Sequence, residues 1–211
     1  MAETKIISNI NEAYQFVGSC APFKIRKAVL SSPLVGENSV YLVALRGTNQ
    51  SMDTKDPLGL PAAALSGGGI RNIYFDLVKN AILKDVPAGE MLVFIGHSLG
   101  GMVCQQLGAD KELKSRYRIL NVLTFGSPYI LFKGSKCPLH RMAERADILP
   151  VICSLAFFAN PFMGNVRHES GGYYFNFLGA HCDSYEKSEV WRKYDCFGIE
   201  NGTRTLTFVE E

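Results

Sequence analysis

The sequence lacks an apolar run long enough to cross a bilayer. Its most apolar stretch, ILPVICSLAFFANPFMG at 148–164, is interrupted by two prolines and an asparagine and is shorter than the about 20 residues that a membrane-spanning helix needs. The N-terminus also lacks a basic start, an unbroken apolar core and a small-residue cleavage site. We therefore expect no transmembrane helix and no secretory signal, and residence in the cytoplasm or export by a non-classical route.

The chain has little net charge and no metal-binding pattern. Its 22 Lys and Arg nearly balance its 20 Asp and Glu, and they form no basic run that would neutralise a phosphate backbone, which argues against nucleic acid as a partner. The six cysteines form no Cys-x-x-Cys pair, and no histidine stands at zinc-ligand spacing. We expect no metal site and free thiols, with disulfides as the alternative in an exported protein.

What is present is an ordinary globular composition, with 47% hydrophobic and 20% charged residues in 211, which predicts a single domain over 1–211. Apolar runs predict strands at 23–30, 39–47, 90–96, 118–128 and 171–177, and a strand ending in a loop over 138–150. Helical spacing groups Ile6, Ile10, Ala13, Tyr14 and Val17, then Ile73, Leu77, Val78, Ala81 and Ile82, and predicts a third helix after Ser98. Strands that alternate with helices predict an α/β fold with a mostly parallel central sheet and helices on both faces.

A serine between glycines ends the most apolar strand, in MLVFIGHSLGGMVCQQLG. Ligands of a parallel sheet bind beyond the carboxyl ends of its strands. A Gly-x-Ser-x-Gly turn exposes the serine Oγ there, and the following helix points its first amides at negative charge that develops beside it. Ser98 is therefore a candidate nucleophile. The alternative is a tight turn whose glycines serve packing and whose serine is incidental.

A nucleophilic serine needs a histidine base, and the chain has four histidines. His181 follows the last predicted strand and stands in a loop before a helix, which is the best position for the base. His97 lies inside the serine turn, where we expect it to pack away from Ser98. His140 and His168 fall in or just before predicted strands, which favours structural roles.

The base in turn needs an acid to orient it. Asp147, in AERADILPV, comes just after a predicted strand. Aspartates at strand ends are also common turn or capping residues, and position alone does not separate these roles. The chain order Ser98, Asp147, His181 is the order of α/β-hydrolases and favours the catalytic one.

Five motifs, VALRGT, VFIGHSLGG, TFGSP, ADILP and AHCDSY, follow one another between residues 41 and 185. Together they resemble the class 3 (fungal-type) lipase family of α/β-hydrolases. The resemblance implies Ser98 as nucleophile, Asp147 as acid and His181 as base, with Thr48 and Leu99 supplying the oxyanion hole. It implies no metal or organic cofactor. VRHESGGYYFNF resembles the strand before the family's histidine loop.

The sequence departs from the family pattern after VALRGT. Many members continue with an Asp-Trp pair, whereas this chain has an insertion over 49–69, and its only tryptophan is Trp191. The insertion carries an apolar segment between a Pro-Gly entry and a triple-glycine exit, which is compatible with a mobile lid or with a surface loop docked on the core. The apolar 148–164 stretch is similarly either an internal helix over the sheet or a patch exposed beside the site.

The combined expectation is a serine hydrolase that cleaves carboxylic esters of lipids, of the triacylglycerol lipase or phospholipase A type, through an acyl-enzyme. Its partner would be a lipid or another acyl ester, with transient contact to a membrane or lipid surface. The alternatives are a soluble esterase or thioesterase, and a non-catalytic interaction module on a lipase-like fold.

Overall fold

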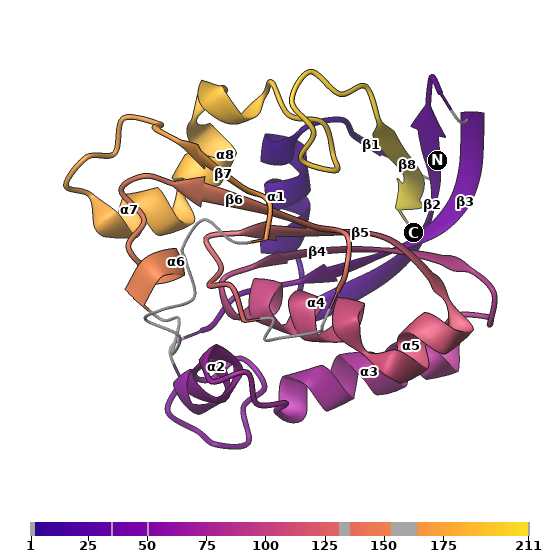
Figure 1. The fold of residues 1–211 in the computed structure, drawn as a ribbon, viewed down its shortest axis with the longest axis horizontal. Helices are drawn as coiled ribbons and strands as arrows, with labels where there is room; N and C mark the ends of the chain where they lie inside the picture. Colours follow the sequence, from indigo (N-terminus) through magenta and orange to yellow (C-terminus); the bar gives the residue numbers. More distant parts are fainter. Residues whose placement is uncertain (1–2, 35, 50, 131–135, 153–163, 211) are drawn as a thin grey trace.

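The computed structural model describes residues 3–34, 36–49, 51–130, 136–152 and 164–210. Its central feature is an eight-stranded sheet in the order β1-β8-β2-β3-β4-β5-β6-β7 (Figure 1). The strands are β1 (Glu3–Ile7), β2 (Phe23–Ser32), β3 (Gly36–Leu45), β4 (Met91–His97), β5 (Arg118–Phe125), β6 (Leu139–Glu144), β7 (Val166–Glu169) and β8 (Thr205–Glu210). The helices are α1 (Ile10–Gly18), α2 (Leu60–Gly67), α3 (Ile73–Asp85), α4 (Leu99–Ala109), α5 (Lys111–Arg116), α6 (Leu149–Ile152), α7 (Phe177–Cys182), α8 (Ser184–Lys187) and the 3-10 helix η1 (Glu189–Trp191).

The strands from β3 to β7 pair in parallel. At the other side of the sheet, β2 is antiparallel to both β3 and β8, and β8 is antiparallel to β1. The fold is therefore α/β with a mostly parallel sheet, as the alternation of strands and helices predicted. The β1–β8 pair, which joins the two ends of the chain, was not predicted.

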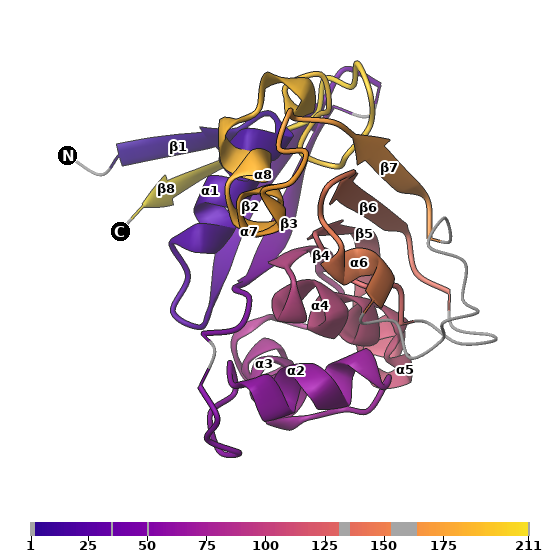
Figure 2. The ribbon, with the colours of Figure 1, turned by 90° about the vertical axis from the view of Figure 1, so that its left-hand side faces the viewer.

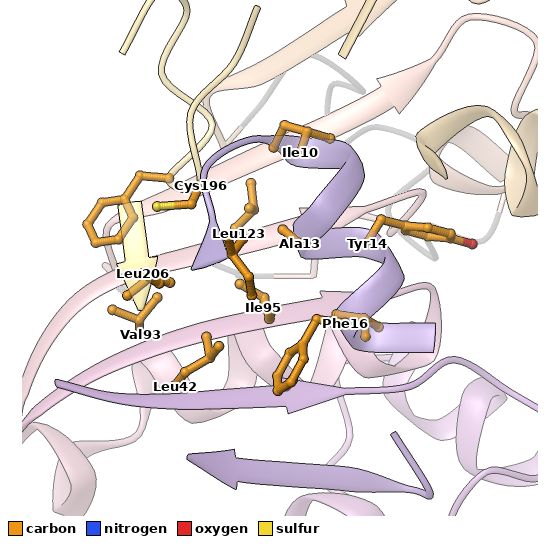
Figure 3. Packing of buried hydrophobic residues seen from close by; sticks show 14 of the residues in the cluster. Ile10, Ala13, Tyr14, Phe16, Leu42, Val93, Ile95, Leu123, Cys196 and Leu206 are labelled. Atoms are coloured by element: carbon orange, nitrogen blue, oxygen red, sulfur yellow. The ribbon is translucent and has the colours of Figure 1, made fainter. Parts of the chain in front are cut away.

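Helices cover both faces of the sheet. In β4, Val93 and Ile95 face a core shared with α1, and Leu92 and Phe94 face a core shared with α3 and α4. Figure 3 shows the first of these cores, where Leu123 of β5 joins the β4 side chains beneath α1. A strand buried on both faces needs apolar residues at successive positions, which explains the unbroken run before Ser98.

The N-terminal helix starts later than its apolar spacing predicted. Ile6, which the spacing placed on the helix, lies in β1 and is 54% exposed. The Asn9 side chain caps α1 by accepting the Glu12 amide at 3.1 Å, and the Glu12 carboxylate accepts the Ser8 amide at 2.6 Å. This reciprocal cap starts the helix at Ile10.

The strand predicted at 171–177 is wrong. The last parallel strand is β7, at Val166–Glu169, and the aromatic residues that follow it form turns leading into α7. Gly172 has φ +87° and Tyr174 φ +30°, which an extended strand does not tolerate. Phe175 is 93% exposed, so the high strand propensity of these aromatic residues is not accompanied by burial against a sheet.

The buried face of α3 is shifted from the predicted one. Val78 and Ile82 are buried as expected, but Ile73 and Leu77 are exposed, and Tyr74 is buried in their place. Tyr74 reaches the end of β3 and donates its hydroxyl to the carbonyl of Pro22 at 2.8 Å. The aromatic side chain thus decides which face of this helix packs.

The segment 138–150, predicted as a strand ending in a loop, contains β6 and a turn, and the loop gives way to the short helix α6. Residues 153–163, most of the apolar stretch 148–164, lie outside the described part of the chain. The prediction of a covering helix or an exposed patch there falls on these residues. Within the described ranges, no helix has the length and apolarity needed to cross a membrane.

The parallel strands bring their carboxyl ends to one edge of the sheet, in front of which α6 and α7 lie (Figure 2). Thr48 follows β3, Ser98 follows β4, Gly126 follows β5 and Asp147 follows β6. His181 lies in α7, which follows β7. Residues scattered over most of the sequence are thereby assembled at the edge where parallel sheets bind ligands.

Candidate active site

Ser98 occupies a strained turn between β4 and α4. Its backbone has φ +51° and ψ −118°, a region that costs a residue with a Cβ about 1–3 kcal/mol. The Ser98 amide donates to the Phe125 carbonyl at 2.9 Å, and the Ser98 carbonyl accepts the Met102 amide at 3.1 Å. The turn is thus held by β5 on one side and by the first turn of α4 on the other.

Close packing explains the glycines on both sides of the serine. A Cβ on Gly100 would lie 2.5 Å from the Arg46 carbonyl oxygen, and one on Gly96 would lie 2.6 Å from the Gly100 carbonyl oxygen. Both distances are shorter than real Cβ contacts. The glycines therefore let α4 approach the ends of β3 and β4. Close packing thus explains the glycines of the motif, as the alternative interpretation proposed, but it does not explain the positive φ of Ser98.

The structure brings Asp147 and His181 together. His181 Nδ1 lies 2.8 Å from Asp147 Oδ2, and both side chains are buried, with 7% and 3% of the residues exposed. Because an ionised carboxylate only accepts, Nδ1 carries the proton and donates it. This tautomer leaves Nε2 as the proton acceptor.

The Asp147 carboxylate is held by further donors. The Leu149 amide donates to Oδ1 at 3.1 Å, and the Tyr185 hydroxyl donates to Oδ2 at 3.2 Å. The Tyr185 oxygen in turn accepts the Glu144 amide at 3.0 Å. Burial, together with the nearby Asp147, raises the pKa of Tyr185 well above its usual value. Tyr185 therefore stays protonated and available as a donor to the carboxylate.

Ser98 and the Asp147–His181 pair meet across the end of β5. The Phe125 carbonyl accepts the Ser98 amide, and a Cβ on the next residue, Gly126, would lie 2.7 Å from Asp147 Oδ2 and 2.9 Å from His181 Nδ1. Among the described residues, Ser98 Oγ and His181 make no hydrogen bond to each other. Such bonds are often long before substrate arrives.

His97 has a larger part in the site than the predicted packing role. Its Nε2 lies 2.9 Å from the His181 carbonyl oxygen, and because the carbonyl accepts, Nε2 is the donor. The two imidazole rings lie 4.5 Å apart, and the His97 ring packs edge-on against Tyr14. Burial first, and then the nearby His181, lower the pKa of His97 to about 3. His97 is therefore a neutral donor that fixes the backbone of His181.

The other two histidines lie in strands. His140 is in β6, with Nδ1 at 2.8 Å from the Asn165 amide nitrogen, and His168 is in β7. Burial is the main cause that lowers the pKa of His140. Both positions agree with the structural roles predicted for them.

The two predicted oxyanion donors lie on either side of the serine turn. Leu99 is the first residue of α4 and is fully buried. Thr48 follows β3, and the preceding Gly47 packs so closely on the serine turn that a Cβ there would lie 3.2 Å from Ser98 Cβ. The Thr48 hydroxyl donates to the Leu58 carbonyl at 2.6 Å. This hydroxyl would have to leave Leu58 to reach an oxyanion.

The insertion over 49–69 contains α2, which is docked rather than detached. The Asn72 side chain donates to the Ala62 carbonyl and to Ser66 Oγ, both at 2.7 Å, and accepts the Phe75 amide at 3.0 Å to cap α3. Leu60 and Leu65 of α2 remain exposed. In this structure the segment is docked on the core, a state that a surface loop and a closed lid share.

Sequence reasoning missed Tyr185 and Gly126. The only signal for Tyr185 was its place in AHCDSY, four residues after His181.

Within the described ranges, no group of three or more His, Cys, Asp or Glu side chains is arranged to hold a metal ion. Neither the models of known protein families nor the curated protein sequences match this chain.

Proposed function

We propose that this protein is a serine hydrolase of the α/β-hydrolase fold that cleaves carboxylic esters of lipids, of the triacylglycerol lipase or phospholipase A type. The observation that carries the proposal is the buried hydrogen bond between His181 Nδ1 and Asp147 Oδ2, at the sheet edge where Ser98 adopts its strained turn. Backbone strain concentrates at functional positions. A carboxylate–imidazole pair beside such a serine matches the arrangement used to activate it.

In the first half of the reaction, Ser98 Oγ attacks the ester carbonyl carbon while His181 Nε2 takes the hydroxyl proton. Asp147 stays ionised and stabilises the imidazolium. The tetrahedral oxyanion accepts hydrogen bonds from the backbone amides of Leu99 and Thr48, each of which is worth about 100- to 1,000-fold in turnover. The imidazolium then gives its proton to the leaving alcohol, and the acyl group stays on Ser98.

In the second half, His181 takes a proton from water, whose oxygen attacks the acyl carbon; the imidazolium then returns the proton to Ser98 Oγ as the bond between Oγ and the acyl group breaks and the fatty acid leaves. His97 supports both halves because its pKa of about 3 keeps it neutral. A cation 4.5 Å from the forming imidazolium would oppose the charge that the reaction creates.

Exposed apolar side chains next to the histidine favour a lipid surface over a soluble substrate. Tyr174, Phe175, Phe177 and Leu178 are all exposed, immediately before His181 and within the loop and first residues of α7. We propose that these four residues insert among lipids. Replacing Phe175 and Leu178 by serine should reduce hydrolysis of emulsified or vesicle-bound esters at least ten-fold, with little effect on a water-soluble short-chain ester. Equal loss on both substrates would argue against surface contact.

The deciding experiment compares wild-type protein with Ser98→Ala on esters from acetyl to long-chain acylglycerol and phospholipid. Loss of turnover in the variant supports the nucleophile, and the preferred chain names the substrate. Preference for short soluble esters or thioesters would favour the esterase alternative. Equal background rates for both proteins, with the fold intact by circular dichroism, would leave the non-catalytic module as the better description.

A further inference from the structure

A cavity of about 290 Å³, with several polar side chains in its wall, opens beside the turn that follows β3. It is bounded by α1 on one side and by the end of α7 and α8 on the other, which lie side by side on the same face of the sheet (Figure 2). The polar side chains that line it are Tyr14, Arg46, Thr48, His97, Cys182 and Glu186. The function proposed above uses only two of these residues, Thr48 and His97.

The cavity adjoins the candidate nucleophile. Gly47, also in its wall, packs on the serine turn, where a Cβ would lie 2.9 Å from His97 Nδ1 and 3.2 Å from Ser98 Cβ. A ligand in the cavity therefore lies beside the serine turn. Its polar lining contrasts with the exposed apolar residues of α2 and α7, which suit an acyl chain.

Two opposite charges face this cavity. Arg46 and Glu186 both line it and both are exposed, and in the described ranges neither side chain forms a salt bridge. Their backbones are fixed: the Arg46 amide donates to the Pro22 carbonyl at 3.0 Å, and the Glu186 carbonyl accepts the Asn11 side chain at 2.9 Å. The cavity thus presents one cation and one anion from two separately anchored segments.

We propose that this cavity binds the zwitterionic head group of a phospholipid, with Arg46 on the phosphate and Glu186 on the ammonium. The arginine fork matches phosphate oxygens. A simple anion would be repelled by Glu186 and a simple cation by Arg46, so a ligand carrying both charges fits best. The inference rests on the proposed function, because it places the phospholipid ester at Ser98 and makes the substrate class a phospholipid.

The test uses glycerophosphocholine, which carries the head group but no acyl ester, so that binding is measured independently of hydrolysis. We expect saturable binding to wild type by calorimetry, about five-fold weaker for Arg46→Gln and for Glu186→Gln, the size typical of one exposed charge pair. Glycerol 3-phosphate, which lacks the ammonium, should bind more weakly to Arg46→Gln but more tightly to Glu186→Gln. Arg192→Gln and Glu189→Gln, which break an exposed ion pair outside the cavity, are the matched controls.

Absence of saturable binding to wild type, or affinities equal to wild type in both cavity variants, would overturn the inference. So would glycerol 3-phosphate affinity unchanged by Glu186→Gln.

Hydrolysis gives a second readout: the ratio of phosphatidylcholine to diacylglycerol turnover should fall about five-fold in Arg46→Gln. If Ser98→Ala abolishes ester hydrolysis while this ratio does not change, the proposed function stands and the head-group site fails. If glycerophosphocholine binds as expected but Ser98→Ala changes nothing, the site stands and the hydrolase proposal fails.

Discussion

Asp147→Asn tests the proposed catalytic pair, Asp147 and His181, most directly, because the hydrogen bonds of Asp147 specify which way the new amide must point. Asp147 Oδ1 accepts the Leu149 amide, and Oδ2 accepts both His181 Nδ1 and the Tyr185 hydroxyl. An asparagine that keeps its oxygen on the Leu149 amide turns its NH₂ toward His181. Nδ1 must then become the acceptor, so the proton moves to Nε2.

A His181 with its proton on Nε2 cannot take the proton of Ser98. The same substitution in a serine protease triad costs about 10⁴-fold in kcat, equivalent to about 5.4 kcal/mol of transition-state stabilisation. We expect a loss of this order in kcat on a short-chain ester at pH 7 to 8, with KM changed far less. The residual activity would come from the oxyanion donors and substrate binding.

The matched control for this substitution is Asp183→Asn. Asp183 lies two residues after His181, is about half exposed and pairs with Lys187. Its replacement by asparagine is the same chemical change close to the site, at a side chain that does not contact the imidazole. It should keep most of the activity. Retention of more than a tenth of wild-type kcat in Asp147→Asn, or an equal loss in both variants, would refute the assignment of Asp147 as the orienting acid.

Three further substitutions test other parts of the structure. Gly126→Ala places a Cβ 2.7 Å from Asp147 Oδ2 at a backbone φ of +56°, so we expect at least ten-fold lower ester turnover and about 1–2 kcal/mol lower stability; unchanged activity would contradict the packing of the pair on β5. Burial lowers the pKa of His97 to about 3 from 6.5, so the free energy of unfolding is unaffected by this group above pH 6.5 and falls by about 1.4 kcal/mol per pH unit as pH drops toward 3. Urea unfolding of His97→Gln between pH 6.5 and 4.5 should lack this contribution of one proton to the pH dependence of stability. The same pH dependence in wild type and variant would refute the neutral state of His97. Asn72→Ala removes the α3 cap and both bonds to α2, and should lower the free energy of unfolding by about 2–3 kcal/mol; a change below about 0.5 kcal/mol, the range of neutral surface changes, would show that α2 is not held there.

The serine turn could be predicted from sequence because its signals are local. The apolar run of β4, the glycines around Ser98 and the helical spacing after it all lie within a few residues of one another, and each reflects burial on both faces of the sheet or close backbone approach. The structure confirms the strand and the helix there. The positive φ of Ser98 agrees with the strained conformation expected of such a turn.

The Asp147–His181 pair could be anticipated only from chain order and from the family resemblance. Their proximity depends on β6 lying beside β5 and on the path of the chain after β7, which no local pattern encodes. The misplaced strand at 171–177 shows the reverse problem. Aromatic residues there have strand propensity, but Gly172 and Tyr174 adopt a positive φ and Phe175 is exposed, so the segment forms turns.

The outermost antiparallel pair, β1 and β8, carried no usable signal because its partners are far apart in sequence. β1 and β8 pair from Glu3↔Glu210 to Ile7↔Leu206, and each strand is too short to be distinguished from a loop by periodicity. Tyr185 was missed for a similar reason, because its role depends on reaching Glu144 and Asp147 from α8.

Contacts between the N-terminal and C-terminal parts of the chain also affect the order in which the protein folds. The Asn11 side chain donates to the carbonyls of Tyr185, Glu186 and Ser188, so α1 can make these contacts only after residues 185–188 have been synthesised. Closing so long a loop is slow, since its entropy must be lost before the contacts form. During synthesis at about 5–20 residues per second, the parallel strands emerge and can pair first. Because His181 precedes this contact region by only a few residues, the hydrogen bond between His181 and Asp147 should form late in folding, after the parallel strands have paired.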